Sequence, residues 1–378
     1  MPLINYLTQI QFGFGSLAQL SQECTRVSIQ RPLIVTDAGV RAAGLVDRVV
    51  AQLAGLPVAI FDGTPPNPNE DAVRKAVRLF NDSRCDGLIA VGGGSAIDLA
   101  KGVAVCARHA GELKSFALIE GGLARITPAT APVVAVPTTA GTGSEVGRGA
   151  ILILDDGRKV GIISPHLIPK SAICDPELTM GLPAQLTAAT GMDAIAHCME
   201  TFMAPAFNPA ADGIALEGLR RGWANIERAV HTPGDRDARL NMMAASTLGA
   251  LAFQKGLGCV HSLSHALGGI NPRLHHGTLN ALFLPAVIEF NRGAESMMQE
   301  QKIERMAQAM QLSNPTDVGA AVASMREKLG LPIGLKALGV PQSQYEQIVE
   351  GALRDHSHTT NPRIASRDDY FEMLRASE

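Results

Sequence analysis

Short apolar runs separated by amphipathic stretches fill the first half of the chain. Buried strands are expected at residues 32–37 (PLIVTD), 56–63 (LPVAIFDG), 86–94 (DGLIAVGGG) and 132–139 (PVVAVPTT). Residues 70–83 have helical spacing instead, with Val73, Val77 and Phe80 on one side, and residues 95–107 are also expected to be helical. Strands that alternate with helices predict a parallel α/β sheet.

The pattern changes near residues 175–183, after which β-branched runs almost disappear. Helical spacing is found at residues 186–203, 213–230, 237–253 and 286–310. We therefore predict two domains: an α/β domain with a parallel sheet at residues 1–180, and an all-α domain at residues 181–378.

Composition narrows the possible functions. Apolar residues make up 46% of the chain and charged residues 18%, so a large core is expected, and the net charge is only −3. Without a basic run, and with only 4% aromatic residues, nucleic acid is not an expected partner. We expect no signal peptide and no membrane span. The six cysteines are scattered without a CxxC pair, which favours a cytoplasmic protein without disulfides.

Two glycine-rich loops follow predicted strands. VGGGSAIDLAK (residues 91–101) places three glycines before a helix, where free N–H groups and the helix dipole favour a phosphate. VPTTAGTGSE (residues 136–145) is rich in hydroxyl groups, and both loops follow strands of one predicted sheet. Asp37 ends the strand at 32–37 and can bind a ribose hydroxyl, which favours NAD over NADP. The alternatives are tight turns without a ligand and, for Asp37, a helix cap.

Histidines and a carboxylate recur at helical spacing in the second half. Asp193 and His197 are four residues apart, as are His261 and His265, so each pair shares a helix face. His275 and His276 follow in an expected turn after Pro272. One aspartate with three histidines would suit Fe(II) or Zn(II), although each pair alone is more often an ordinary surface contact.

In combination, these motifs resemble those of the iron-containing (group III) alcohol dehydrogenases, which have a dehydroquinate synthase-like fold. The matching stretches run through nearly the whole chain. They are GGGSAIDLAK, PTTAGTGSE, DPELT, LPAQLTAATGMDAIAHCME, VHSLSHALG, HHGTLNALFLP and TNPR. The resemblance implies an N-terminal dinucleotide domain, a C-terminal metal domain, a cleft between them and a homodimer or larger homo-oligomer.

The resemblance also implies particular site residues. The family's metal ligands correspond to Asp193, His197, His261 and His276. His275 stands where the family usually has proline; it keeps the upstream spacing, whereas His276 keeps the register into the following helix, so His276 is preferred. His265 matches a position associated with proton relay and is the expected catalytic residue. The implied cofactor-binding residues are Asp37, Asn67, Gly93, Gly94, Ser95, Asp98, Thr138, Thr139, Thr142 and Lys159.

The expected activity is reversible hydride transfer between a small alcohol and NAD, with Fe(II), or else Zn(II), acting on the substrate oxygen. The substrate is a small molecule, either a neutral alcohol or aldehyde, a diol, or a hydroxy acid. Few fixed cations favour a neutral one, although His356, His358 or Arg363 could recognise an acid. The alternative enzyme is a metal- and NAD-dependent lyase of the dehydroquinate synthase type, and a non-enzymatic binding protein is the remaining hypothesis.

Overall fold

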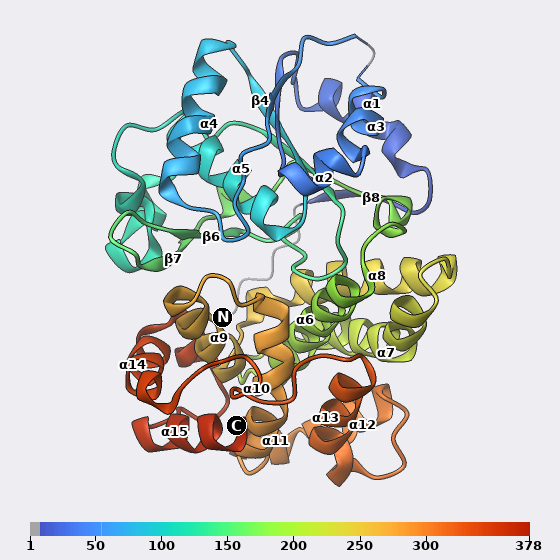
Figure 1. Ribbon diagram of the computed structural model, residues 1–378, viewed down its shortest axis with the longest axis vertical. Coiled ribbons are helices and arrows are strands. Elements are labelled where there is room, and N and C mark those ends of the chain that lie inside the picture. The colour runs from blue at the N-terminus through green and yellow to red at the C-terminus, as the bar shows by residue number, and fades with distance from the viewer. Residues whose placement is uncertain (1–7, 54) are drawn as a thin grey trace. The chain divides into compact units, whose positions relative to one another are not determined.

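The computed structural model describes residues 8–53 and 55–378, and these form two compact units (Figure 1). The α/β unit contains the described residues up to Thr139 together with Gly143–Gly181. The helical unit contains Leu182–Glu378 together with Ala140–Thr142.

A six-stranded sheet forms the centre of the α/β unit. The strands are β1 (Gln9–Phe12), β2 (Pro32–Val35), β3 (Ala59–Phe61), β4 (Gly87–Gly92), β5 (Val133–Pro137) and β8 (Ser171–Cys174). Their order across the sheet is β1-β8-β5-β4-β2-β3, and every neighbouring pair is parallel. The carboxyl ends of all six strands therefore lie at one edge of the sheet.

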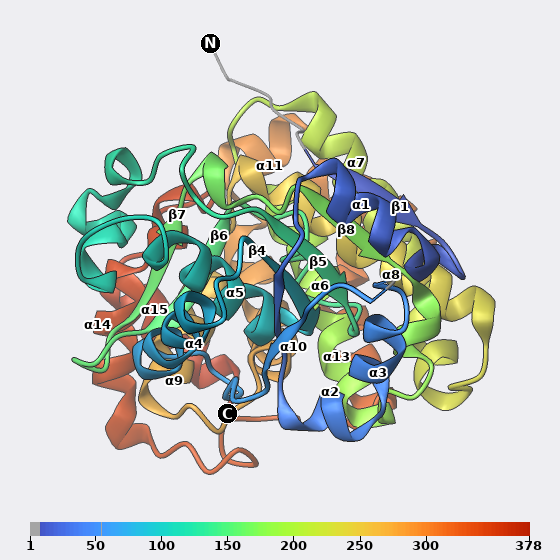
Figure 2. The ribbon, with the colours of Figure 1, turned by 90° about the horizontal axis from the view of Figure 1, so that it is seen from above.

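Alternate residues of the central strands enter two different cores. Leu33 and Val35 belong to one core and Ile34 to the other, because successive side chains of a strand point to opposite faces. The first core includes helices α4 (Glu70–Asp82) and α5 (Gly94–Cys106). The second includes α1 (Leu20–Arg26) and α3 (Leu45–Val50), and short α2 (Ala38–Ala42) precedes α3. Figure 2 shows these two groups of helices on opposite sides of β4. Helices on both faces explain why the central strands β2, β4 and β5 are buried and apolar throughout.

An antiparallel hairpin, β6 (Gly149–Ile153) with β7 (Lys159–Ile163), is attached to α5. The buried Lys101 Nζ donates to the carbonyl oxygens of Gly147 (2.9 Å) and Gly149 (2.7 Å). Burial lowers the pKa of Lys101 to about 8. Strands β1, β6 and β8 were not among the elements expected from the sequence, whereas the resemblance implied a lysine-bearing strand at β7.

The second unit is built of helices. They are α6 (Ala184–Met203), α7 (Pro209–His231), α8 (Arg236–Ala252), α9 (Cys259–Ile270), α10 (His276–Asn291), α11 (Glu295–Gln299), α12 (Lys302–Ala309), α13 (Val318–Lys328), α14 (Tyr345–Arg354) and α15 (Arg367–Ala376). Every residue of α6 from Thr187 to Met203 is buried, so α6 forms the core of this unit. Among the described residues, no helix is long and apolar enough to cross a membrane.

The expected fold class, a parallel α/β unit followed by a helical unit, is confirmed. Two local expectations are wrong. The helical pattern at residues 286–310 is divided among α10, α11 and α12, and Gln301 between the last two has a left-handed backbone (φ 49°). His276 does not lie in a turn but is the first residue of α10, with His275 as the preceding N-cap residue.

Candidate metal centre and cofactor site

The buried helix α6 provides three acid or imidazole groups on one face. Asp193, His197 and Glu200 are spaced at i, i+4 and i+7, which brings them into one row along the helix. All three side chains are buried. Charged or polar groups are costly to bury unless they are paired or bind a cation. The sequence of α6 therefore directs a row of possible ligands into the centre of the helical unit.

Helix α9 adds His261 to this row. One ligand atom each from Asp193, His197 and His261 lies within 4.8 Å of the others. The rings of His197 and His261 stack with their centroids 4.7 Å apart. Burial holds the pKa of His261 well below its ordinary value, so the ring stays neutral, as a metal ligand must be. A carboxylate with neutral imidazoles fits Fe(II) or Zn(II), and a cation there would balance the charge of a buried carboxylate.

Glu200 connects α6 to the beginning of α9. Its carboxylate contacts His261 Nδ1 and accepts a hydrogen bond from the Val260 backbone N–H (2.9 Å), which belongs to the first turn of the helix. Burial raises the pKa of Glu200 to about 8, whereas a cation beside His261 favours the carboxylate form. Asn361 Oδ1 accepts from the next free N–H of α9, that of Cys259 (3.1 Å). Glu200 and Asn361 therefore fix where α9 begins and how His261 is turned.

Helix α10 brings His276 to the same place. His276 Nε2 lies 3.8 Å from Asp193 Oδ1, whereas His275 is exposed. Asn280, one turn later, donates to Asp193 Oδ1 (2.7 Å), and its Nδ2 lies 3.1 Å from His276 Nε2. A Cβ atom on Gly277 would lie 2.2 Å from the carbonyl oxygen of Ala189 in α6. The close approach of α10 to α6 therefore requires glycine beside His276.

His265 lies beside these groups, with its ring 5.2 Å from that of His276 and nearly parallel to it (10°). Its Nδ1 is 2.9 Å from Asp355 Oδ2. The facing His265 and His356 lower the pKa of Asp355 against the effect of burial, so Asp355 remains a carboxylate. The pairing makes Nδ1 of His265 the protonated nitrogen and leaves Nε2 as an acceptor.

Several predicted cofactor residues gather at the carboxyl ends of β2, β4 and β5. Gly93 is the extended N-cap residue of α5, and a Cβ atom on it would lie 3.2 Å from Thr139 Oγ1. The adjacent Thr138 is buried, and its backbone N–H donates to the Gly92 carbonyl (3.0 Å). Asp37 Oδ1 caps α2 through the Val40 N–H (2.9 Å). Gly94 is the first residue of α5.

Other predicted cofactor residues already have protein partners. Lys159 Nζ donates to Asn67 Oδ1 (3.1 Å), which brings these two predicted residues together. Ser95 Oγ donates to the Pro66 carbonyl. Asp98 is enclosed: it accepts from Ser144 Oγ (2.6 Å) and from the Ile151 N–H (2.9 Å), which attaches the hairpin to α5. Thr142 belongs to the segment Ala140–Thr142, which is grouped with the helical unit.

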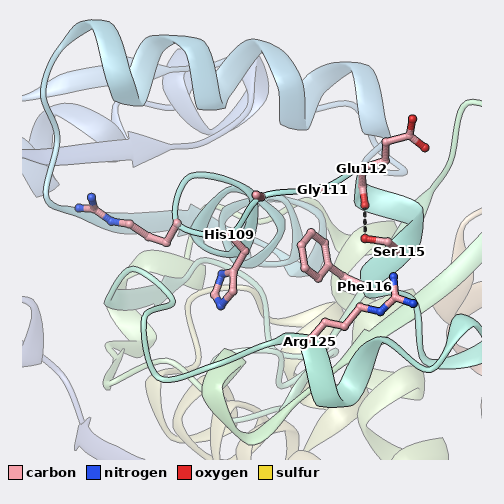
Figure 3. A pocket seen from close by; sticks show the side chains of 8 residues that line it. His109, Gly111, Glu112, Ser115, Phe116 and Arg125 are labelled. Atoms are coloured by element: carbon pink, nitrogen blue, oxygen red, sulfur yellow. Dashed lines mark hydrogen bonds between the residues drawn. The ribbon is translucent and has the colours of Figure 1, made fainter.

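A separate surface pocket follows the end of α5, and none of the site residues predicted from the sequence lines it (Figure 3). Its lining includes His109, Ser115, Phe116 and Arg125. The His109 ring contacts Phe116 edge-on, and its nitrogens are bonded to the Val105 carbonyl (3.0 Å) and the Thr127 hydroxyl (2.9 Å). The imidazole of His109 is therefore engaged by the protein itself, and the pocket is not assigned a function.

Sequence reasoning missed four supporting residues: Glu200, Asn280, Asp355 and Asn361. The i+7 spacing of Glu200 from Asp193 was a usable signal, because it places the carboxylate on the ligand face of α6. Asn280 lies at i+4 from His276, which again is a helical spacing. Asp355 had no local signal, since its partner is 90 positions away. Asn361 lies in the TNPR stretch, but its contact with Cys259 spans 102 positions and could not be predicted locally.

Comparisons with known proteins show the family of this chain. The model of the family "Iron-containing alcohol dehydrogenase" matches residues 8–176, and that of the "Fe-containing alcohol dehydrogenase family, C-terminal" matches residues 187–378. A 4-hydroxybutyrate dehydrogenase of Cupriavidus necator is 59% identical over the full length of both chains. The crystal structure of a 1,3-propanediol oxidoreductase is similar with a TM-score of 0.93 and 35% identity, again over 100% of both chains.

A third similar protein is the sulfoacetaldehyde reductase of Bifidobacterium kashiwanohense, solved in complex with NAD+. It has a TM-score of 0.89 and 26% identity, over 100% of this chain and 99% of that one. Enzymes of this family use NAD(H) and an iron ion. Since both family models match and the relative at 59% identity is matched over its full length, the chain belongs to the iron-containing alcohol dehydrogenases and is an oxidoreductase that acts on CH–OH groups.

Proposed function

We propose that the protein catalyses the reversible, NAD-linked oxidation of a short ω-hydroxy carboxylate, 4-hydroxybutyrate, at an iron centre held by Asp193, His197, His261 and His276. The observation that carries this proposal is the buried convergence of Asp193, His197 and His261, in a chain that is 59% identical to a 4-hydroxybutyrate dehydrogenase. The hydroxy acid replaces the neutral alcohol as the preferred substrate because of that similarity.

The chemistry of the donor atoms supports a divalent metal. Two imidazoles and a carboxylate converge, and His276 offers a third imidazole 3.8 Å from Asp193. A metal bound there supplies Lewis-acid polarisation of the substrate oxygen, and NAD accepts or returns the hydride. Fe(II) is favoured over Zn(II) because iron is the metal of the family.

His265 is proposed to carry the hydroxyl proton. Asp355 accepts from Nδ1, which leaves Nε2 free to take a proton from the substrate hydroxyl during oxidation and to return it during reduction. The side chain of His265 is 11% exposed, so a proton can pass from it to solvent. Asp355 is then the group that selects the tautomer and holds the ring in place.

The cofactor site is proposed at the carboxyl edge of the sheet, with Asp37, Gly93, Gly94, Thr138 and Thr139 nearest the β2, β4 and β5 ends. The beginning of α5 offers free N–H groups to the pyrophosphate. The second oxygen of Asp37 is available to a ribose hydroxyl and would repel a 2′-phosphate, which favours NAD over NADP. The other proposed cofactor residues are Asn67, Ser95, Asp98, Thr142 and Lys159.

The test is the rate of NADH formation by Fe(II)-loaded protein with 4-hydroxybutyrate, 1,3-propanediol and 1-butanol. We expect the highest kcat/KM with 4-hydroxybutyrate, and a chelator should remove the activity. Faster turnover of either neutral alcohol would contradict the proposed substrate class. Net NAD turnover also separates a dehydrogenase from a lyase that regenerates its NAD.

Two variants test the proposed ligands. Asp193→Ala should bind no iron and form no NADH, because it removes the carboxylate between His197 and His276. Asp237→Ala, which changes an exposed carboxylate on α8 of the same unit, is the matched control and should keep both. Iron binding retained by Asp193→Ala would contradict the proposed ligand set.

We also propose that the enzyme is cytoplasmic and works as a homodimer. The six cysteines all lie in the described part of the chain and form no disulfide, which is typical of proteins in a reducing compartment. Light scattering of the purified protein tests the dimer, and a monomeric mass would contradict it.

A further inference from the structure

A second group of nitrogen and oxygen ligands lies beside the candidate metal centre. His265, Asp355 and His356 each offer one ligand atom within 4.8 Å of the others, and we name them the His265–Asp355–His356 cluster. His265 comes from α9, Asp355 follows α14, and His356 begins the short 3-10 helix His356–Thr360. The cluster shares no side chain with the proposed iron ligands.

The two imidazoles of the cluster lie on the same carboxylate oxygen. Both Nδ1 atoms face the same carboxylate oxygen, Asp355 Oδ2, at 2.9 Å from His265 and 3.7 Å from His356. The two rings stack with their centroids 5.7 Å apart. Ligand atoms bonded to Zn(II) at tetrahedral angles are about 3.3 Å apart, which lies between these two distances. Only the first distance is a hydrogen bond, so a simple aspartate–histidine pair does not account for His356.

The surroundings of the cluster hold the Asp355 carboxylate in place and leave the three side chains accessible to solvent. The other oxygen of Asp355 accepts from the Ser357 N–H (2.8 Å), which fixes the carboxylate on the 3-10 helix. The side chains of His265, Asp355 and His356 are 11%, 12% and 32% exposed, so an ion can enter from solvent. Three protein ligands and access to water leave an open coordination position, which is typical of exchangeable sites.

We propose that the His265–Asp355–His356 cluster binds a second divalent cation independently of the iron centre, and Zn(II) is the ion we expect there. Two imidazoles and one carboxylate are the ligand types that Zn(II) accepts. The site binds more weakly than the first, because it has three protein ligands instead of four and is open to solvent.

The second ion has a consequence for catalysis, and this part rests on the proposed function. A cation in the cluster binds His265 through Nδ1, so the proton of that nitrogen moves to Nε2, which can then no longer accept a proton from the substrate hydroxyl. The cation also holds the ring that stacks on His276. His265 can then no longer be supported by Asp355 as the proton carrier. Zn(II) that fills the cluster therefore inhibits the iron-loaded enzyme.

The binding test uses the metal-free full-length protein titrated with Zn(II) against a chromophoric chelator. We expect two equivalents for the unchanged protein, and only the tighter one for His356→Asn. Asp193→Ala should keep only the weaker one. His358→Asn is the matched control, since this neighbouring histidine is bonded to the Tyr370 hydroxyl (2.9 Å) outside the cluster, and it should keep both.

Three results would overturn the site: a single equivalent in the unchanged protein, two equivalents retained by His356→Asn, or loss of the second equivalent in His358→Asn. The inhibition test adds Zn(II) briefly to the iron-loaded enzyme and measures its retained iron afterwards. Inhibition should need at least tenfold more Zn(II) in His356→Asn than in the unchanged protein. A second equivalent without inhibition would confirm the site and contradict the role given to His265.

Discussion

The contact between Glu200 and His261 gives a quantitative expectation for metal affinity. Glu200→Gln keeps the size of the side chain but removes its charge and one of its two acceptor oxygens. The amide oxygen can then serve either the Val260 N–H or His261 Nδ1, but not both, whereas the carboxylate serves both. His261 therefore loses either its orientation or its position at the beginning of α9.

The size of the effect follows from the kind of bond that is lost. A hydrogen bond to a charged group contributes about 1.5–3 kcal/mol. At about 1.4 kcal/mol for each factor of ten, this corresponds to a 10- to 100-fold weaker metal affinity. Removal of the partner of a metal-bound histidine commonly costs the same 10- to 100-fold range.

The assay is equilibrium competition for Co(II) between the metal-free protein and a chromophoric chelator, with the visible spectrum of the bound Co(II) as a second readout. We expect the Kd of Glu200→Gln to rise 10- to 100-fold and the Co(II) spectrum to shift. Glu217→Gln is the control, since Glu217 is an exposed carboxylate on α7 paired with Arg220. Equal affinities and spectra for the two variants would refute the reasoning.

Three further changes test other parts of the structure. Gly277→Ala should lower the free energy of unfolding by about 3 kcal/mol in urea titrations, because its Cβ atom would meet the Ala189 carbonyl. Gly213→Ala on α7 has open space for its Cβ atom, so the free energy of unfolding should rise by about 0.5–1 kcal/mol. Asp37→Asn keeps the cap of α2 and removes the charge, so kcat/KM for NADP relative to NAD should rise about tenfold; an unchanged ratio would exclude Asp37 from the ribose site. Burial lowers the pKa of Lys101 to about 8 from 10.5, so between these pH values the unfolded chain binds a proton that the folded protein does not. The unfolding free energy relative to Lys101→Met should therefore rise from pH 8 to pH 10, and a flat difference in urea midpoints would contradict a buried, readily deprotonated lysine.

Local patterns predicted the central strands and most of the helices correctly. The strands β2, β4 and β5 are apolar and end in turn residues, and α4 and α6 have clear helical spacing, so each is visible within one short window. Strand β1 was missed because Gln9–Phe12 is short and polar, and its partner β8 is about 160 positions away. The hairpin β6–β7 carried a usable local signal, the Asp156-Gly157 turn, in which Gly157 has φ 84°.

The candidate site could also be predicted where it depends on spacing within one helix, but not where it depends on contacts between helices. Spacing within one helix pairs Asp193 with His197, and the structure brings His261 to that pair. Spacing could not choose between His275 and His276, because the choice depends on where α10 begins, and the packing of Gly277 on α6 determines that point. The contact of His265 with Asp355 joins segments 90 positions apart, which no local pattern reveals.

The cap that Asn361 places on α9 has a consequence for the order of events during synthesis. Cys259 and His261, two residues later, leave the ribosome long before Asn361, which follows Cys259 by 102 positions. Until Asn361 arrives, the first turn of α9 lacks one of its hydrogen-bond partners, and His261 is less firmly oriented. The α/β unit can fold in the meantime, because N-terminal domains generally fold first. We therefore expect the metal centre to bind iron more weakly in chains that stop before Asn361 than in the full-length chain.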